Sequence, residues 1–133
     1  MNVVDILNRA REYELEVSAQ IEHVERLRRI AAIEHKSSAY SQQIVEKLAA
    51  LERDINRSID RAADAKKEAL DLIGHLTGEE RSVIEHYYIL GEKWEVVARK
   101  TYMSERRVFI VRQNALDKLS KIKECDNERI TEI

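Results

Sequence analysis

Proline is absent from this chain of 133 residues, and glycine occurs only at positions 74, 78 and 91. These two residue types interrupt helices most strongly, because proline lacks a backbone donor and glycine loses the most conformational freedom. Ala, Glu, Arg, Leu and Ile are abundant. We therefore predict an all-α fold whose long helices are broken at residues 36–43, 74–78 and 90–93.

A heptad pattern runs through residues 44–76 and predicts a coiled-coil helix. Its second half is lined by serine and alanine, which bury little apolar surface per residue, so we expect that half to be the more loosely packed. The residues of this seam recur at alternating steps of four and three: Ile44, Leu48, Leu51, Ile55, Ser58, Ala62, Ala65, Ala69, Leu72 and Leu76.

A second seam of the same period precedes the first. The polar segment HKSSAYSQQ, residues 35–43, separates the two seams and suits a turn. Residues 1–76 are thus predicted to form a long antiparallel helical hairpin, coiled-coil-like, with arms of about 30 residues and roughly 45 Å. The upstream seam consists of Val3, Leu7, Ala10, Val17, Ile21, Val24 and Ala31.

A two-helix hairpin with alanine-rich seams is only marginally stable by itself, because too little apolar area leaves water to offset the entropy of ordering it. Two arrangements would add the missing burial. In the first, two hairpins associate and the protein is a homodimer, with the hairpin as its oligomerisation or partner surface. In the second, the hairpin packs on the C-terminal part of its own chain. We predict the homodimer and keep the monomer as the alternative.

Shorter helices are predicted between residues 77 and 123. Thr77 and Glu80 have the spacing of a capping box, and Gly91 is well placed to end the first of these helices in the left-handed conformation. A second helix covers about residues 93–100. Ser104 is a good N-cap for a third helix that reaches about Lys123, and residues 124–133 are predicted to be a polar tail.

The last of these helices is amphipathic at 100° per residue. Its buried stripe is predicted to be Val108, Val111, Ala115, Leu119 and Ile122. The opposite face carries Arg106, Ile110, Gln113 and Asp117, flanked by Phe109 and Asn114. Ala98, Val108 and Val111 fall where a helix-turn-helix needs a small residue at the helix crossing and two aliphatic residues beneath the recognition helix. Residues 77–123 are therefore predicted to form a helix-turn-helix domain.

Charge is distributed unevenly along this part of the chain. Residues 99–123 hold eight Lys or Arg and two acidic residues, 8 − 2 = +6, and residues 79–98 hold two and five, 2 − 5 = −3. The formal net charge of the whole chain is −2. A positive end on a nearly neutral protein is typical of a nucleic-acid-binding surface.

The segment LTGEERSVIEHYYILGEKWEVVARKTYMSERRVFIVRQNALDKLSKI, residues 76–122, resembles the region-4 helix-turn-helix of sigma-70-type transcription factors. The likeness is strongest in RSVIEHYYILG, WEVVARKTYMSERRV and NALDKL. A charged helical hairpin followed by such a module is similar to phage-encoded transcriptional regulators of the RinA and ArpU type. The resemblance implies a sequence-specific regulator of phage or mobile-element origin that binds double-stranded DNA by docking its last helix in the major groove. It also implies RNA polymerase as a partner of the hairpin, in competition with the homodimer.

The same resemblance implies the DNA-contacting residues. Carried over by position, Lys93 takes a phosphate, and the residues that face base edges are Glu105, Arg106, Phe109, Ile110 and Gln113. Cationic and polar neighbours complete the predicted DNA-binding set: Lys93, Arg99, Lys100, Ser104, Glu105, Arg106, Arg107, Phe109, Ile110, Gln113 and Asn114.

Two positions leave alternatives open. The turn position that is often Gly in the family is Tyr102 here, so this residue must adopt a positive φ or the chain must use another turn. Phe109 and Ile110 can contact thymine methyl groups but cannot form hydrogen bonds with bases. Exposed apolar residues there would also suit a protein partner, so a protein-interaction module, for example one that binds RNA polymerase, is the alternative function.

The sequence does not indicate an enzyme. His23, His35, His75 and His86 show no metal-ligand spacing, and there is no Gly-rich phosphate loop or nucleophile elbow. We predict no catalytic, cofactor or metal site and no small-molecule substrate. Cys125 is the single cysteine, and no apolar run approaches the roughly 20 residues of a membrane span. These features predict a cytoplasmic protein without a signal peptide or membrane segment.

Overall fold

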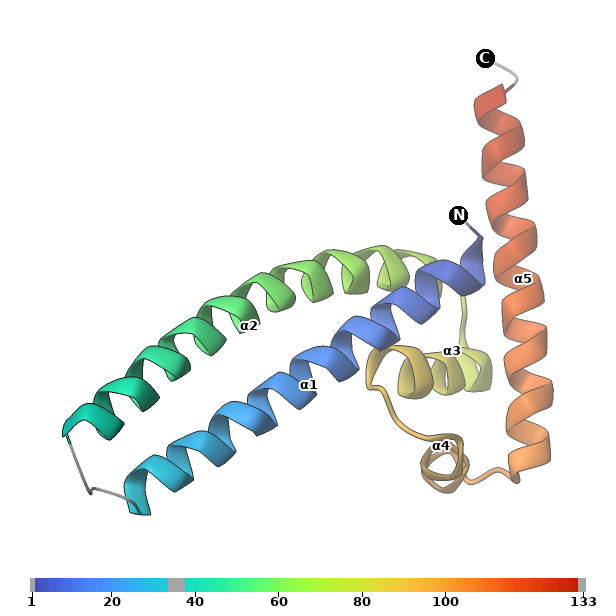
Figure 1. Ribbon diagram of the computed structural model, residues 1–133. Helices are drawn as coiled ribbons and strands as arrows, with labels where there is room; N and C mark the ends of the chain where they lie inside the picture. The colour runs from blue at the N-terminus through green and yellow to red at the C-terminus, as the bar shows by residue number, and fades with distance from the viewer. Residues whose placement is uncertain (1, 34–37, 132–133) are drawn as a thin grey trace.

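The computed structural model describes residues 2–33 and 38–131, and this part of the chain is helical without any strand, which confirms the all-α prediction (Figure 1). A single turn of π-helix, η1, interrupts the sequence of α-helices and continues the third of them. The elements are α1 (Val3–Ile33), α2 (Ser38–Ile73), α3 (Gly78–Ile84), η1 (Glu85–Ile89), α4 (Trp94–Lys100) and α5 (Glu105–Thr131).

Helices α1 and α2 lie side by side and run in opposite directions (Figure 1). Three ion pairs join them, and the residue number in α2 falls as that in α1 rises, as an antiparallel pair requires. The helix α2 already begins at Ser38, so residues 38–43 of the predicted turn are helical because no proline or glycine breaks them. Residues 35–37 of that turn lie outside the described residues. The pairs are Glu14–Lys66 at 3.1 Å, Glu16–Arg61 at 3.5 Å, and Arg28–Glu52.

The main core lies where α1 and α2 meet the C-terminal helices. We call residues 3–10 of α1 and 65–73 of α2 the near end of the pair. Their buried side chains pack with those of α3, η1 and α5, so the core crosses the predicted domain boundary at residue 76. The division into two domains stays a prediction. The core consists of Val3, Ile6, Leu7, Ala10, Ala65, Ala69, Ile73, Leu76, Ile84, Tyr88, Ala115, Leu116 and Leu119.

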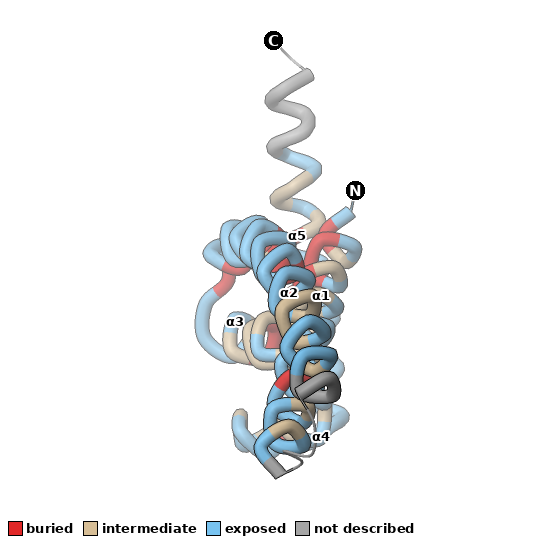
Figure 2. The backbone as a smooth tube through the Cα atoms, turned by 60° about the vertical axis from the view of Figure 1, so that its left-hand side comes forward, coloured by how far each residue is buried: buried red, intermediate tan, exposed pale blue. Residues whose placement is uncertain are grey.

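The prediction that the alanine-lined half of the seam is the looser one is wrong. Ala65 and Ala69 are 5% and 0% exposed, whereas Ile44, Leu48 and Leu51 are only partly buried. We call residues 21–32 of α1 and 42–55 of α2 the far end, and most of its residues are exposed, as Figure 2 shows. Small side chains at the near end let α1 and η1 approach α2, and α5 packs on α1 in the same core, while the far end has only the opposite helix to pack against.

A second core lies between α3, α4 and α5. It contains one residue of α3, two of α4 and two of α5, with the partly buried Tyr87, Trp94 and Met103 packed against it. Helix α5 contributes to both cores. Its predicted stripe is confirmed except that Ile122 is only partly buried, and Leu116 is buried as well. The second core consists of Val83, Val97, Ala98, Val108 and Val111.

Four predictions about helix ends have different outcomes. Gly91 adopts φ +69°, and the Ser104 Oγ accepts the Arg107 N–H at 3.1 Å, so both of these predictions are confirmed. The capping box is wrong, because the Thr77 side chain makes no capping hydrogen bond. Gly78, at φ +60°, replaces the ordinary first helical residue that such a box requires. The predicted end of the last helix near Lys123 is also wrong, because α5 continues to Thr131 in a stretch without a breaker.

Candidate nucleic-acid interface

A tight turn connects α4 to α5. Tyr102 adopts φ +58°, so it takes the positive φ rather than another turn. The Tyr102 N–H donates to the Arg99 carbonyl at 3.4 Å, and the Met103 N–H donates to the Ala98 carbonyl at 3.0 Å. These bonds form a Schellman motif, which ends α4 and brings the start of α5 within a few residues. The Tyr102 side chain is 97% exposed at the tip of this turn.

Helix α5 is held on one side by small and aliphatic residues. Val108 and Ala115 are fully buried, and Val111 is 4% exposed. Ala98 of α4 is 6% exposed in the same core as Val108 and Val111, and its single methyl group lets the two helices approach closely. The N-terminal half of α5 is thereby fixed against α3 and α4 along one face only.

The opposite face of this half is open. Arg106, Phe109, Ile110 and Gln113 are all exposed and follow one another at steps of three, one and three residues, so they form one continuous patch on the helix. We call this patch the outer face of α5. Phe109 and Ile110 are each 48% exposed. The Gln113 Nε2 donates to the Asp117 Oδ1 at 3.1 Å, which orients the amide.

Phe109 packs against a stack of two aromatic rings, those of Trp94 and Tyr87. The Phe109 ring lies 5.3 Å from the Trp94 ring, centroid to centroid, and Trp94 is stacked on Tyr87 at 3.6 Å and 9°. Guanidinium groups lie over two of these rings, with Arg11 4.2 Å from the Tyr87 centroid and Arg112 5.5 Å from that of Trp94. Contributions from α1, η1, α4 and α5 therefore meet in this stack.

The π-helical turn separates two neighbouring tyrosines. Tyr88 is fully buried in the main core, whereas Tyr87 is only partly buried and turns toward Trp94. The Tyr88 hydroxyl accepts hydrogen bonds from Arg112 Nε at 3.2 Å and Arg112 Nη2 at 3.0 Å. Burial raises the pKa of the Tyr88 hydroxyl above its usual range, although the Arg112 guanidinium acts in the opposite direction. The two cores are thus joined through Arg112.

Acidic side chains from residues 79–98 neutralise part of the positive stretch. Glu92 pairs with Lys100 at 3.0 Å, and two more carboxylates of the −3 segment pair with cations of the +6 segment. Among the residues that the structure describes, Arg99, Arg106 and Lys121 make no ion pair. The electrostatic footprint is therefore smaller than the sequence count suggests. The other pairs are Glu79–Arg107 at 3.1 Å and Glu80–Lys118 at 3.0 Å.

Glu92 also holds the loop between η1 and α4. Its carboxylate lies 2.9 Å from His86 Nδ1, and its backbone carbonyl accepts from Arg11 Nη2 at 3.4 Å. Burial alone would raise the pKa of the Glu92 carboxyl, but the hydrogen bonds from His86 and Lys100 outweigh burial and lower the pKa below its usual range. The loop is thus tied to α1, η1 and α4 at once.

The predicted DNA-binding residues fall into two groups. Lys100, Ser104 and Arg107 are exposed but already have partners within the chain, Ser104 as a cap and the other two in ion pairs. The remaining eight are exposed on α4, on α5 or just before α4: Lys93, Arg99, Glu105, Arg106, Phe109, Ile110, Gln113 and Asn114.

Sequence reasoning missed the structural importance of Arg112. At 100° per residue, Arg112 lies about 40° from Val108, inside the predicted buried stripe. A guanidinium in an apolar stripe indicates a buried hydrogen-bond partner, and Tyr88 is that partner. This signal was present in the sequence, whereas the partner itself lies 24 residues upstream and follows only from the fold.

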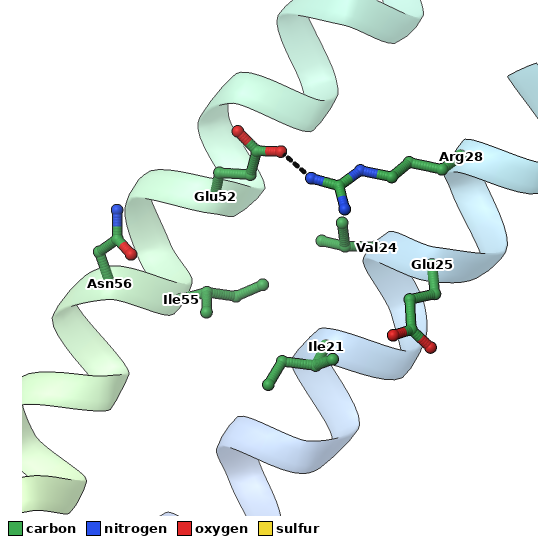
Figure 3. A pocket seen from close by; sticks show the side chains of 7 residues that line it. All are labelled: Ile21, Val24, Glu25, Arg28, Glu52, Ile55 and Asn56. Carbon is green, nitrogen blue, oxygen red and sulfur yellow. Dashed lines mark hydrogen bonds and ion pairs between the residues drawn. The ribbon is translucent and has the colours of Figure 1, made fainter.

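A groove of about 360 Å³ lies away from this interface, between α1 and α2 at the far end (Figure 3). Arg28 and Glu52 close one side of it, and Ile21 and Ile55 face each other across it (Figure 3). No group of three or more His, Cys, Asp or Glu in the described ranges is placed to hold a metal ion. None of the described helices has the length and apolar character needed to cross a membrane.

Comparisons of the chain with protein-family models, with curated proteins and with solved structures gave no match.

Proposed function

We propose that this protein is a transcriptional regulator that binds double-stranded DNA sequence-specifically, with α4 and α5 acting as a helix-turn-helix. One observation carries the proposal. The N-terminal half of α5 is anchored along a single buried face, and its outer face presents a guanidinium, an amide and two apolar side chains to solvent. An α-helix fits into the major groove, about 12 Å wide, where each base pair shows a distinct pattern of donors, acceptors and methyl groups.

The exposed side chains suit separate roles in such a complex. Arg106 has the geometry to donate two hydrogen bonds to a guanine, and Gln113 to pair with an adenine. Lys93 and Arg99, which lie before and at the end of α4, are placed to contact phosphates. Phosphate contacts would fix the position of α5 in the groove, and base contacts would select the sequence.

Site selection from random duplex DNA, followed by fluorescence-anisotropy titration, tests the proposal. Arg106→Ala should weaken binding to the selected site by about 1 to 3 kcal/mol and relax the preference at one base pair. Arg57→Ala is the matched control, because Arg57 is a well-exposed arginine on α2 and should change nothing. Recovery of no preferred sequence, or an unchanged preference in Arg106→Ala, would contradict the proposal.

The dependence of affinity on salt gives a second readout. With three cations such as Lys93, Arg99 and Lys121 on phosphates, the slope of log K against log salt should be about −3 for each copy of the chain. Lys93→Ala and Arg99→Ala should each flatten this slope by about 1 and weaken all sequences alike. A slope near zero would mean that phosphates are not contacted.

We further propose that two copies associate through the far end of the hairpin formed by α1 and α2. Large apolar side chains there stay exposed, 63% for Val45 and 40% for Ile21, and Ile21 lines the groove of Figure 3. A two-fold dimer would carry two recognition helices and bind an inverted repeat with half-sites spaced by one or more helical turns of roughly 34 to 36 Å.

Sedimentation at micromolar concentration tests the dimer separately. The full chain should sediment as a dimer, and Val45→Asp with Ile21→Asp should sediment as a monomer that keeps its helical circular dichroism. A monomeric wild-type chain with a non-palindromic selected site would contradict the dimer while leaving the DNA-binding proposal intact. That outcome would favour a single asymmetric DNA element, with RNA polymerase as the partner of the hairpin.

A protein-interaction module is the second candidate function. Phe109 and Ile110 are each 48% exposed, which favours this function, because exposed apolar residues surrounded by polar ones often mark protein–protein interaction sites. Binding of purified RNA polymerase with no selected DNA sequence would support this candidate over the first.

A further inference from the structure

We infer that the outer face of α5 recognises thymine methyl groups, so that its preferred DNA element carries thymines at its centre. This inference rests on the proposed function and specifies which bases the helix prefers. Phe109 and Ile110 stand side by side in the middle of the outer face, with Arg106 one turn before them and Gln113 one turn after. The patch is therefore polar at both ends and apolar at its centre.

A base edge that contacts the apolar centre of the patch loses its hydrating water molecules. In the major groove every base presents hydrogen-bonding groups, and only thymine adds a methyl group, which stands beside its O4 acceptor. Phe109 and Ile110 can neither donate nor accept hydrogen bonds, so they gain apolar contact from a thymine methyl group and gain nothing comparable from the other bases. Thymine is the base that suits this centre.

The aromatic stack makes Phe109 a fixed contact. Its ring rests against Trp94 at 5.3 Å, and Trp94 is itself stacked on Tyr87 at 3.6 Å beneath the Arg11 guanidinium. Phe109 therefore has little room to change position. The ring packs against Trp94 on one side, and 48% of the residue stays exposed to solvent. A contact held in this way loses little conformational entropy on binding.

Helix geometry limits where the thymines lie. Gln113 lies seven positions after Arg106, about 10.5 Å along the helix at 1.5 Å per residue. That length covers roughly three base-pair steps of 3.4 Å when the helix follows the groove. The expected element therefore has thymines between a base contacted by Arg106 and a base contacted by Gln113.

Replacement of thymine by deoxyuridine in the selected duplex tests this directly, because deoxyuridine keeps every hydrogen-bonding group and lacks only the methyl group. Each removed methyl group in contact with Phe109 or Ile110 should weaken binding about fourfold, from about 0.8 kcal/mol per buried CH₂. Deoxyuridine outside the central window should leave the affinity unchanged, and this duplex is the control.

The variants Phe109→Ala and Ile110→Ala complete the test. Each should bind the thymine duplex more weakly and should lose the sensitivity to one methyl group, while Phe109→Leu should keep it. Ile110 is not part of the aromatic stack, so Ile110→Ala retains the folded domain even if Phe109→Ala loosens it.

Equal affinities for the thymine and deoxyuridine duplexes would overturn the inference and leave sequence-specific binding by α5 standing. A selected element without thymine in its central window would do the same. Failure to bind any duplex specifically would overturn the proposed function and this inference together.

Discussion

The two ends of the α1–α2 pair show opposite relations between side-chain size and burial. At the near end, Ala65 and Ala69 are 5% and 0% exposed, although alanine has little surface to bury. At the far end, the larger Val45 and Ile21 are 63% and 40% exposed. Burial in this molecule is therefore decided by how many helices meet at a position, and small residues are what allow several helices to meet.

The two ends of the α1–α2 pair are also stabilised by different interactions. The near end shares a continuous apolar core with η1 and α5, whereas the far end relies on a narrower seam around Val24 and Ile55 and on exposed ion pairs such as Arg28–Glu52. Exposed ion pairs contribute typically 0.2 to about 1 kcal/mol. The near end should therefore dominate stability, and the far end is free to serve association.

Truncation of a leucine at each end should show the largest difference. Leu7→Ala removes a fully buried side chain from the near end and should destabilise the protein by about 2 to 5 kcal/mol. Leu48→Ala at the partly buried far end should cost roughly 1 kcal/mol or less. Urea denaturation followed by circular dichroism measures both free energies of unfolding. Equal losses would remove the distinction between the ends.

Replacing a buried alanine by a larger residue should also destabilise the near end, by overfilling the core, but less than the loss of a leucine side chain. Ala69→Leu should overfill the near end, where Ala69 is fully buried against other helices, and cost about 1 to 3 kcal/mol. Ala50→Leu at the far end has room at a partly buried position and should change stability by about 0.5 kcal/mol or less. Melting temperatures at equal protein concentration compare the two variants.

Acid should weaken the loop between η1 and α4, where Glu92 holds contacts to α1, η1 and α4. The folded pKa of Glu92 lies below its usual range, so its contribution to stability is complete above the ordinary carboxyl range and is lost as pH falls through the folded pKa. Wild type should therefore lose more stability than Glu92→Gln between roughly pH 5 and pH 3. Parallel pH profiles for wild type and Glu92→Gln would contradict this assignment.

Local patterns predicted the helices and the faces of α5 well. The alternation that places Val108, Val111 and Ala115 inward and Arg106 and Gln113 outward depends only on the helical repeat, which the sequence carries within a few turns. Gly91 and Ser104 likewise act on their own neighbours. Features that depend only on neighbouring residues in the sequence can be predicted without knowledge of the tertiary fold.

Long-range features were beyond such patterns. The firmer packing of the alanine-lined half depends on η1 and α5, which join α1 and α2 in one core only in the folded chain. Pairing of Arg107 with Glu79 spans 28 residues, so a count of charges along the sequence cannot reveal that this pair neutralises a cation of the predicted DNA-binding set. The π-helical turn that holds the buried Tyr88 and the partly buried Tyr87 has no signal in helix propensity either.

The main core joins residues from opposite ends of the chain, and this has a consequence for biosynthesis. Val3 and Leu119 belong to the same core, yet 119 − 3 = 116 residues of synthesis separate them. At 5–20 residues per second, roughly 6 to 23 s pass before the first turns of α1 meet their last partner. During that interval the far end can already pair, while Val3, Ile6 and Leu7 stay open to chaperones and to other nascent chains. The yield of folded protein should therefore depend on translation speed through residues 77–119.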